Sequence, residues 1–253
     1  MESGDNCLIF SMKDQQKKII IIGATSGIGR ELARTFALKG FHVGVAGRRM
    51  NLLLSLQEEF PQNIFIECFD VTGKENIPHF QGLIEKLEGL DILVYNSGYG
   101  ETSDNLDWEV ENKTTAVNVN GFIEIVCYGF NYFLNQGYGQ IACTSSIASI
   151  RGNSMAPAYS AGKAFESTYM EGLFLKAKRL QKEIAITDIQ PGFVDTHLAK
   201  GDRKFWVAPV EKAAAQMYTA IQKKKKRAYI TRRWRIIAWL LKYMPAFIYN
   251  RLG

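Results

Sequence analysis

The chain has 253 residues, of which 47% are hydrophobic and 22% charged, a composition that excludes a disordered chain and suits one large α/β domain. Its formal net charge is +6, but from Lys212 onward there are eleven Lys and Arg residues and no Asp or Glu, so the excess is local. Such a charge would fit nucleic-acid binding, but the scaffold predicted below does not. The four cysteines (7, 68, 127 and 143) and three histidines (42, 79 and 197) have no paired or clustered spacing, which excludes a disulfide framework and predicts no metal.

The N-terminal residues 1–16 are expected to form a flexible extension, with translation starting at Met1 or, alternatively, at Met12. The apolar stretch Cys7–Phe10 is far too short for the hydrophobic region of a secretory signal. We therefore expect a cytoplasmic protein, in which residues 17–231 form the catalytic domain.

A glycine-rich segment follows the first predicted strand. Ile19–Ile22 is a β-branched run typical of a strand buried on both faces, and Gly23-Ala-Thr-Ser-Gly27-Ile-Gly29 comes directly after it. Residues 30–38 then have apolar positions at helical spacing and end at Gly40. This order predicts a dinucleotide site, in which the helix N-terminus binds a pyrophosphate; an ordinary strand-to-helix turn is the alternative.

The second predicted strand, Phe41–Val45, is followed by Ala46-Gly-Arg48-Arg49, with no acidic residue before Glu58. NAD-binding enzymes place a carboxylate here for the ribose 2′-hydroxyl, whereas a guanidinium binds a 2′-phosphate. The segment favours NADP(H) over NAD(H), with Arg48 ahead of Arg49 as the phosphate ligand. Alternatively, one arginine only begins the next helix in solvent.

Further strand-like runs alternate with helical stretches along the rest of the domain. The predicted strands are Ile64–Phe69, Leu90–Tyr95, Gln140–Thr144, Ile184–Gln190 and Arg227–Thr231. They predict a single-domain, Rossmann-type, doubly wound parallel sheet with helices on both faces.

A proton-transfer site is predicted at Tyr159 and Lys163. The two lie one helical turn apart, on the same face, and a nearby ammonium lowers the pKa of a tyrosine, which is about 10 when free. Ser146 follows an apolar strand, where ligands bind on open parallel sheets, and its hydroxyl can donate to a carbonyl oxygen. The Tyr-x-x-x-Lys pair alone would often be a solvated helix face; its place relative to Ser146 and the glycine segment favours catalysis.

Together these motifs resemble the short-chain dehydrogenase/reductase family over roughly Lys17 to Ile230. The resemblance implies that Tyr159 is the general acid/base, Lys163 tunes it and binds the nicotinamide ribose, and Ser146 orients the substrate carbonyl. It also implies that Asn118 helps to hold a proton-relay water. The implied catalytic residues are Asn118, Ser146, Tyr159 and Lys163; the implied cofactor-binding residues are Gly23, Thr25, Ser26, Gly27, Ile28, Gly29, Arg48, Arg49, Asp70, Val71, Asn96, Gly98, Tyr159, Lys163, Pro191, Gly192, Val194 and Thr196.

Two parts of this assignment have their own implications and alternatives. The resemblance implies that Asp70 contacts adenine, although Asp70 or Thr72 could instead cap the next helix. It also implies that Pro191–Thr196 closes over the nicotinamide carboxamide and diphosphate. The helices expected at Lys113–Leu134 and Pro157–Leu180 commonly form the dimer interface in this family, so we expect a homodimer or homotetramer.

The chain departs from the family pattern at two places. Ile22 stands where the family usually has Thr, and Tyr95-Asn-Ser-Gly98 stands where it usually has Asn-Asn-Ala-Gly. Because Asn96 and Gly98 are retained, we expect these changes to alter local strand packing rather than cofactor binding.

The C-terminal segment, residues 232–253, is basic and apolar. Lys223–Arg227 and Arg232–Arg235 precede an apolar stretch, Ile236–Tyr249, that is too short to span a bilayer and is interrupted by Lys242 and Pro245. It suits an amphipathic segment on an anionic membrane surface, or, alternatively, a lid on the substrate pocket or a subunit contact. These readings are compatible.

The same end narrows the expected substrate. The Asp-Gly-Gly ending of many family members that act on acyl-carrier-protein substrates or sugars is missing, and the segment that usually covers substrate is mostly apolar: Phe193, His197, Leu198, Phe205 and Trp206. We therefore expect an NADPH-dependent reductase of a lipophilic ketone. The alternatives are an NAD-dependent alcohol dehydrogenase on a small soluble substrate and a non-catalytic, cofactor-binding scaffold.

Overall fold

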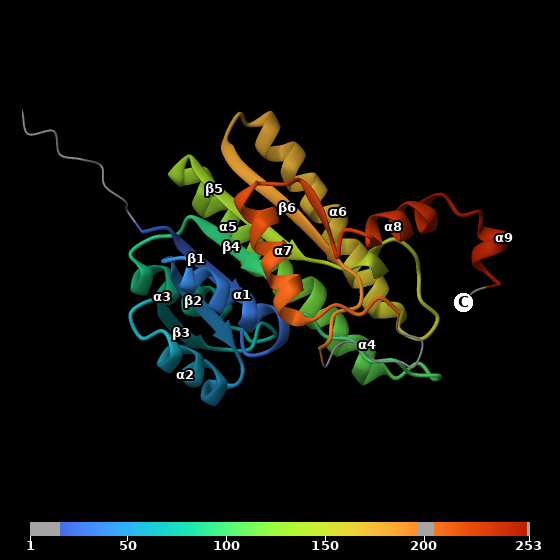
Figure 1. Ribbon diagram of the computed structural model, residues 1–253, viewed down its shortest axis with the longest axis horizontal. Coiled ribbons are helices and arrows are strands. Elements are labelled where there is room, and N and C mark those ends of the chain that lie inside the picture. Colours follow the sequence, from blue (N-terminus) through green and yellow to red (C-terminus); the bar gives the residue numbers. More distant parts are fainter. Residues whose placement is uncertain (1–15, 197–204, 252–253) are drawn as a thin grey trace, which may run out of the picture.

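The protein is built on a seven-stranded sheet with the strand order β3-β2-β1-β4-β5-β6-β7. The computed structural model describes residues 16–196 and 205–251, and every pair of neighbouring strands in the sheet is parallel (Figure 1). The strands are β1 Lys18–Ile22, β2 His42–Gly47, β3 Ile64–Cys68, β4 Ile92–Tyr95, β5 Tyr138–Thr144, β6 Glu183–Pro191 and β7 Arg227–Ile230. The predicted Rossmann-type fold is confirmed, with strand ends displaced by one or two residues.

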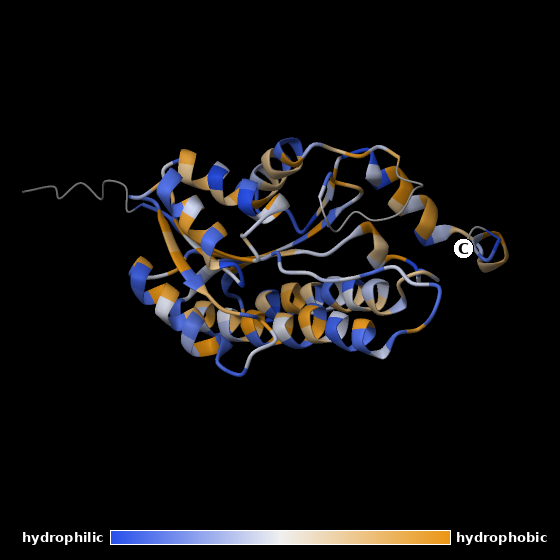
Figure 2. Ribbon diagram, turned by 90° about the horizontal axis from the view of Figure 1, so that it is seen from below, coloured by the Kyte–Doolittle hydropathy of each residue, from blue (hydrophilic) through white to orange (hydrophobic). Residues whose placement is uncertain are grey.

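Helices cover both faces of the sheet, and in Figure 2 the helices of the two faces form separate layers on either side of it. One face packs against α1 (Gly27–Leu38), α2 (Met50–Glu59) and α7 (Val210–Gln222). The other packs against α3 (Asn76–Leu87), α5 (Phe122–Gln136) and α6 (Pro157–Arg179). The central strand β1 shows why the sequence requires this arrangement: Ile20 and Ile22 enter one core, while Ile19 and Ile21 enter the other.

The helix expected at Lys113–Leu134 is longer and contains an irregular turn. It consists of α4 (Trp108–Thr115), a π-helical turn (Ala116–Gly121) and α5. Tyr95 contacts this turn, because its buried hydroxyl donates to the carbonyl of Val117 at 2.7 Å. Gly121, the last residue of the turn, lies against the backbone of Val71, since a Cβ there would overlap the carbonyl of Val71. The widened turn carries Asn118, in keeping with the frequent presence of π turns at functional sites.

The chain ends in two short helices beyond the sheet, α8 (Trp234–Tyr243) and α9 (Ala246–Tyr249). Both project from the body of the molecule at the side where the C-terminus lies (Figures 1 and 2). No helix in residues 16–196 and 205–251 is long and apolar enough to cross a membrane. The two basic groups seen in the sequence are separated, since Lys223–Arg227 leads into β7 and Arg232–Arg235 follows it.

Candidate active site

The glycine-rich segment joins the end of β1 to the first turn of α1. Gly23 has φ +88° and Gly27 has φ +56°, values that favour glycine, and a Cβ at Gly29 would overlap the carbonyl oxygen of Gly23. Asn96, at the end of β4, donates to the same carbonyl at 3.0 Å. The segment therefore folds back tightly on the ends of two neighbouring strands.

The N-terminus of α1 faces this turn. Ser26 is its N-cap residue, yet within the described chain its side chain makes no capping hydrogen bond. The amides of Gly27, Ile28 and Gly29 form the first turn, where helical N–H groups lack partners inside the helix. Such amides bind phosphate, so this cradle fits the pyrophosphate of a dinucleotide. Ile28 is half-buried and packs on the core below.

Arg48 and Arg49 follow β2, as predicted, but their side chains face different partners. Arg49 donates from Nη2 to Thr25 Oγ1 and to Ser26 Oγ, each at 2.6 Å. Its guanidinium therefore lies over the glycine-rich segment. Arg48 turns toward Asp70, with 3.4 Å between Nη1 and Oδ2. The site thus has one arginine beside the phosphate cradle and a second on the β3 side.

Asp70 and Thr72 bind each other rather than capping the next helix, so that alternative is wrong. Asp70 Oδ1 accepts from the backbone N–H of Thr72 at 3.0 Å and from its hydroxyl at 2.9 Å, whereas α3 begins only at Asn76, with Glu75 as its N-cap. Burial alone would raise the pKa of Asp70, but the bonds from Thr72 and the charge of Arg48 hold it below its usual value. Asp70 is therefore an anion at the edge of a hollow of about 480 Å³ that Arg48 also lines.

Ser146 lies just beyond the end of β5, and Lys163 reaches the same strand end from α6, where its Nζ donates to the carbonyl of Thr144 at 3.0 Å. Ser146 caps the short 3₁₀ helix Ile147–Ser149, and its Oγ accepts from the N–H of Ala148 at 3.1 Å, which leaves the hydroxyl able to donate. Tyr159 and Lys163 lie on α6, with the Lys163 ammonium 6.0 Å from the centre of the Tyr159 ring. Tyr159 is half-buried, whereas Lys163 is buried.

Asn118 is buried and connects the π turn to the loop after β4. Its Oδ1 accepts from the N–H of Tyr99 at 2.9 Å, and its Nδ2 donates to the carbonyl of Tyr99 at 2.8 Å. Gly98 lies in the same place, since a Cβ there would come within 3.2 Å of Lys163 Nζ. The structure therefore brings Asn118, Gly98 and Lys163 together, as the sequence predicted.

Two site residues were missed by the sequence analysis. Glu166 is fully buried on α6, and both of its carboxylate oxygens lie 3.0 Å from Lys163 Nζ. Gly100 lies against Tyr159, because a Cβ at Gly100 would overlap the tyrosine ring. For Gly100, the one signal in the sequence was its spacing from Gly98 in Gly98-Tyr-Gly100. Glu166 lies three residues after Lys163 on one helix, and this spacing would equally suit an ion pair on the protein surface.

The segment expected to close over the cofactor begins at the end of β6. Pro191 is the last residue of β6, and Val194 is buried and forms a bridge with Ala208. Thr196 lies next to Gly27, where a Cβ would come within 3.2 Å of its methyl group. The segment thus approaches the phosphate cradle. His197 and Leu198 lie outside the described residues.

Gly192 lies where this segment contacts helix α8. A Cβ at Gly192 would overlap the indole of Trp234, the first residue of α8, and Phe193 meets the same indole edge-on, with ring centres 5.5 Å apart. Arg151 makes a second connection, donating to the carbonyls of Leu241 and Met244. α8 therefore packs directly on the loops that follow β5 and β6.

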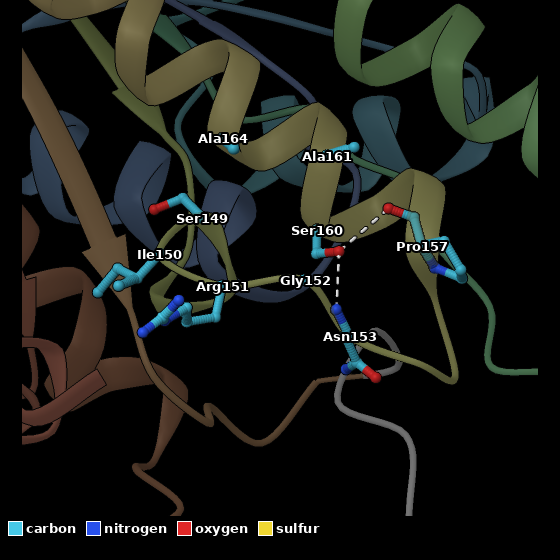
Figure 3. Close-up of a pocket in the computed structure, with 9 residues that line it drawn as sticks. All are labelled: Ser149, Ile150, Arg151, Gly152, Asn153, Pro157, Ser160, Ala161 and Ala164. Atoms are coloured by element: carbon cyan, nitrogen blue, oxygen red, sulfur yellow. Dashed lines mark hydrogen bonds between the residues drawn. The ribbon is translucent and has the colours of Figure 1, made fainter. Parts of the chain in front are cut away.

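Figure 3 shows a second hollow, of about 430 Å³, between α6 and the loop that contains Arg151. Ser160 lines this hollow; its hydroxyl accepts from the N–H of Asn153 at 3.1 Å and donates to the carbonyl of Pro157 at 3.0 Å (Figure 3). Ala161 and Ala164 line it from α6. Tyr159 and Lys163, which lie next to Ser160 and Ala164 in the sequence, do not line this hollow.

Comparison with known proteins identifies the family. The family model for short chain dehydrogenases matches residues 17–206. The chain belongs to the short-chain dehydrogenase/reductase family. It is 34% identical to an uncharacterized oxidoreductase of Myxococcus xanthus over 71% of this chain and 72% of that protein. It is also 28% identical to a dehydrogenase/reductase SDR family protein 7-like protein of Dictyostelium discoideum, over 82% of this chain and 68% of that protein.

Solved structures agree on the fold. A 3-ketoacyl-(acyl-carrier-protein) reductase from Brucella melitensis, crystallised with NADH, superposes with a TM-score of 0.78 at 19% identity, covering 85% of this chain and 98% of that one. A short chain dehydrogenase from Bacillus anthracis gives a TM-score of 0.75 at 20% identity, covering 84% and 94%. The predicted family is confirmed, and the chain is an NAD(P)-dependent oxidoreductase of that family.

Proposed function

We propose that this oxidoreductase is an NADPH-dependent reductase of a lipophilic ketone, with Tyr159 as the proton donor. The observation that carries the proposal is the environment of Lys163 Nζ, which lies 6.0 Å from the centre of the Tyr159 ring and 3.0 Å from the carbonyl of Thr144, two residues before Ser146. Asn118 binds the loop after β4, and Asn96 at the start of that loop binds Gly23 of the phosphate cradle. The bound nicotinamide supplies the hydride. The protein's own part is to orient the carbonyl and to deliver a proton to its oxygen.

Each side chain has a distinct task in this reaction. Ser146 donates a hydrogen bond to the carbonyl oxygen and holds it in reach of Tyr159, whose hydroxyl gives the proton as negative charge develops there. Lys163 remains charged, because the attraction of Glu166 raises its pKa although burial alone would lower it. Its ammonium stabilises the phenolate that remains after transfer. Asn118 is proposed to help hold the relay water near Lys163.

The preference for NADPH rests on the two arginines after β2. Arg49 already binds Thr25 and Ser26 of the cradle, and Arg48 lines the hollow beside Asp70. Two guanidinium groups favour a 2′-phosphate and leave no carboxylate directly after β2 for a 2′-hydroxyl. The structure supports Arg49 at least as strongly as Arg48, which the sequence ranked first.

A lipophilic substrate at a membrane surface is supported by α8. Ile236, Trp239, Leu240 and Tyr243 follow helical spacing, and all four are exposed, while Trp234 and Ala238 on the other side are buried. Arg235 and Lys242 flank this exposed stripe. A helix with apolar, aromatic and basic residues in this pattern lies well in the interface of an anionic bilayer. We propose a cytoplasmic enzyme with peripheral membrane contact, in which residues 232–253 form the contact segment.

Titration with NADPH and NADH, followed by a panel of carbonyl compounds from small diketones to long-chain ketolipids, tests the proposal. We expect tighter binding of NADPH and turnover of the apolar ketones. Tighter binding of NADH with oxidation of a small alcohol would favour the NAD-dependent dehydrogenase. Cofactor binding without turnover of any carbonyl or alcohol would favour the cofactor-binding scaffold.

A further inference from the structure

We infer that Glu166 is a positioning residue for the proposed proton transfer: it fixes the Lys163 ammonium at the floor of the site and offsets its charge, which sets the pH range in which Tyr159 remains a proton donor. This inference rests on the proposed reductase function. It assigns a role to a buried carboxylate that the sequence analysis did not single out.

The geometry leaves Lys163 little freedom. Its Nζ lies 3.0 Å from Glu166 Oε1, 3.0 Å from Oε2 and 3.0 Å from the carbonyl oxygen of Thr144, at the end of β5. The backbone of Gly98 closes in from another side. An ammonium has three N–H donors, so these acceptors define where the charge sits.

Glu166 is the partner whose charge changes near neutral pH. Burial raises its pKa to about 7, although Lys163 acts in the opposite direction. Lys163 itself stays protonated there, since its pKa is raised by Glu166 against the effect of burial. The pair therefore carries a net positive charge at low pH and is neutral at higher pH.

The other groups that face Glu166 come from three strands. On β5, the Cys143 thiol donates to Oε2 at 3.6 Å, and burial raises the pKa of that thiol well above its usual value. On β6, Asp188 favours the neutral form of Glu166 but is itself bound by Ser167 at 2.7 Å and Arg227 at 3.1 Å. On β4, burial and then the charge of Glu166 raise the pKa of Tyr95.

This arrangement affects the direction of catalysis. When Glu166 is ionised, it compensates the Lys163 charge, and the tyrosine is favoured as a neutral phenol that can give a proton to a ketone. Without that compensation, the ammonium favours the phenolate, which cannot donate. Glu166 thus extends reduction to higher pH.

The Glu166→Gln variant tests the role, because glutamine keeps the shape and loses the charge. We expect the alkaline limb of the pH profile of kcat for ketone reduction to move to lower pH by about one unit, with the Kd for NADPH changed by less than about threefold. The matched control is Glu171→Gln, an exposed glutamate on the same helix that faces Lys226 at 3.6 Å; its profile should match the wild type. A Glu166→Gln profile that is lowered equally at all pH values would overturn the inference.

A second measurement needs neither turnover nor a variant. Carbon-13 NMR of carboxyl-labelled glutamate in the wild-type protein should show a carboxyl signal that titrates near 7. If that signal titrates but no ketone is reduced, the proposed function fails while the buried pair stands. If no glutamate signal titrates near 7, the inference about Glu166 is wrong whatever the enzyme reduces.

Discussion

Arg48 and Arg49 are adjacent in sequence, but only Arg49 binds the phosphate cradle, through Thr25 and Ser26. Replacing either arginine by alanine should weaken NADPH binding by about tenfold to a hundredfold, because each removes charge-assisted hydrogen bonds to the 2′-phosphate. Binding of NADH should change by less than threefold. Fluorescence titration of both cofactors checks this; equal losses for NADPH and NADH would instead indicate a general collapse of the site.

Glu166 also makes the free energy of unfolding depend on pH. Its pKa is raised from 4.5 to about 7 in the folded protein, so the folded state binds more protons than the unfolded state between these values. The free energy of unfolding must then fall as pH rises through this window. Urea unfolding of the wild type and Glu166→Gln should show their difference changing by about 1–3 kcal/mol between pH 4.5 and 7. A pH-independent difference would contradict the raised pKa.

At the scale of elements, α8 presents an exposed stripe in which Trp239 is 62% exposed and Tyr243 64%. Changing both to serine should reduce binding to vesicles that contain anionic lipid by at least tenfold, since interfacial aromatic residues are lost. Added salt should weaken the wild-type interaction. Vesicle sedimentation provides the measurement.

The control for this experiment is Leu38→Ser at the end of α1, an apolar side chain that is 70% exposed on a different element. It should bind vesicles like the wild type. If the α8 variant binds as well as this control, the stripe serves as a subunit contact or as part of the lid.

Some elements of the fold could be predicted from the sequence and others could not. β1 was predictable because four consecutive isoleucines suit a strand buried on both faces, and the glycine-rich segment follows from its spacing. The π turn at Asn118 was not, since its apolar and polar residues follow ordinary helical spacing, and its contact with Tyr95 through Val117 joins residues far apart in the chain. Glu166 was missed for a similar reason: only the folded sheet shows that its face of α6 is buried.

At the scale of the whole molecule, we propose that the outer faces of α5 and α6 join two copies into a dimer. Leu175 on α6 is 57% exposed, and a buried arginine at this point would be costly. Leu175→Arg should therefore lower the mass measured by light scattering, from dimer to monomer or from tetramer to dimer. Leu54→Arg, at an exposed leucine of α2 on the opposite face of the sheet, should leave the mass unchanged.

The central claim is that Tyr159 delivers the proton during ketone reduction. The most direct measurement is single-turnover oxidation of bound NADPH by a ketone that the wild type accepts, compared between the wild type and Tyr159→Phe. We expect a rate lower by about 10²–10⁴-fold with an unchanged Kd for NADPH, because only the donor hydroxyl is removed. A variant that retains the wild-type rate would contradict it.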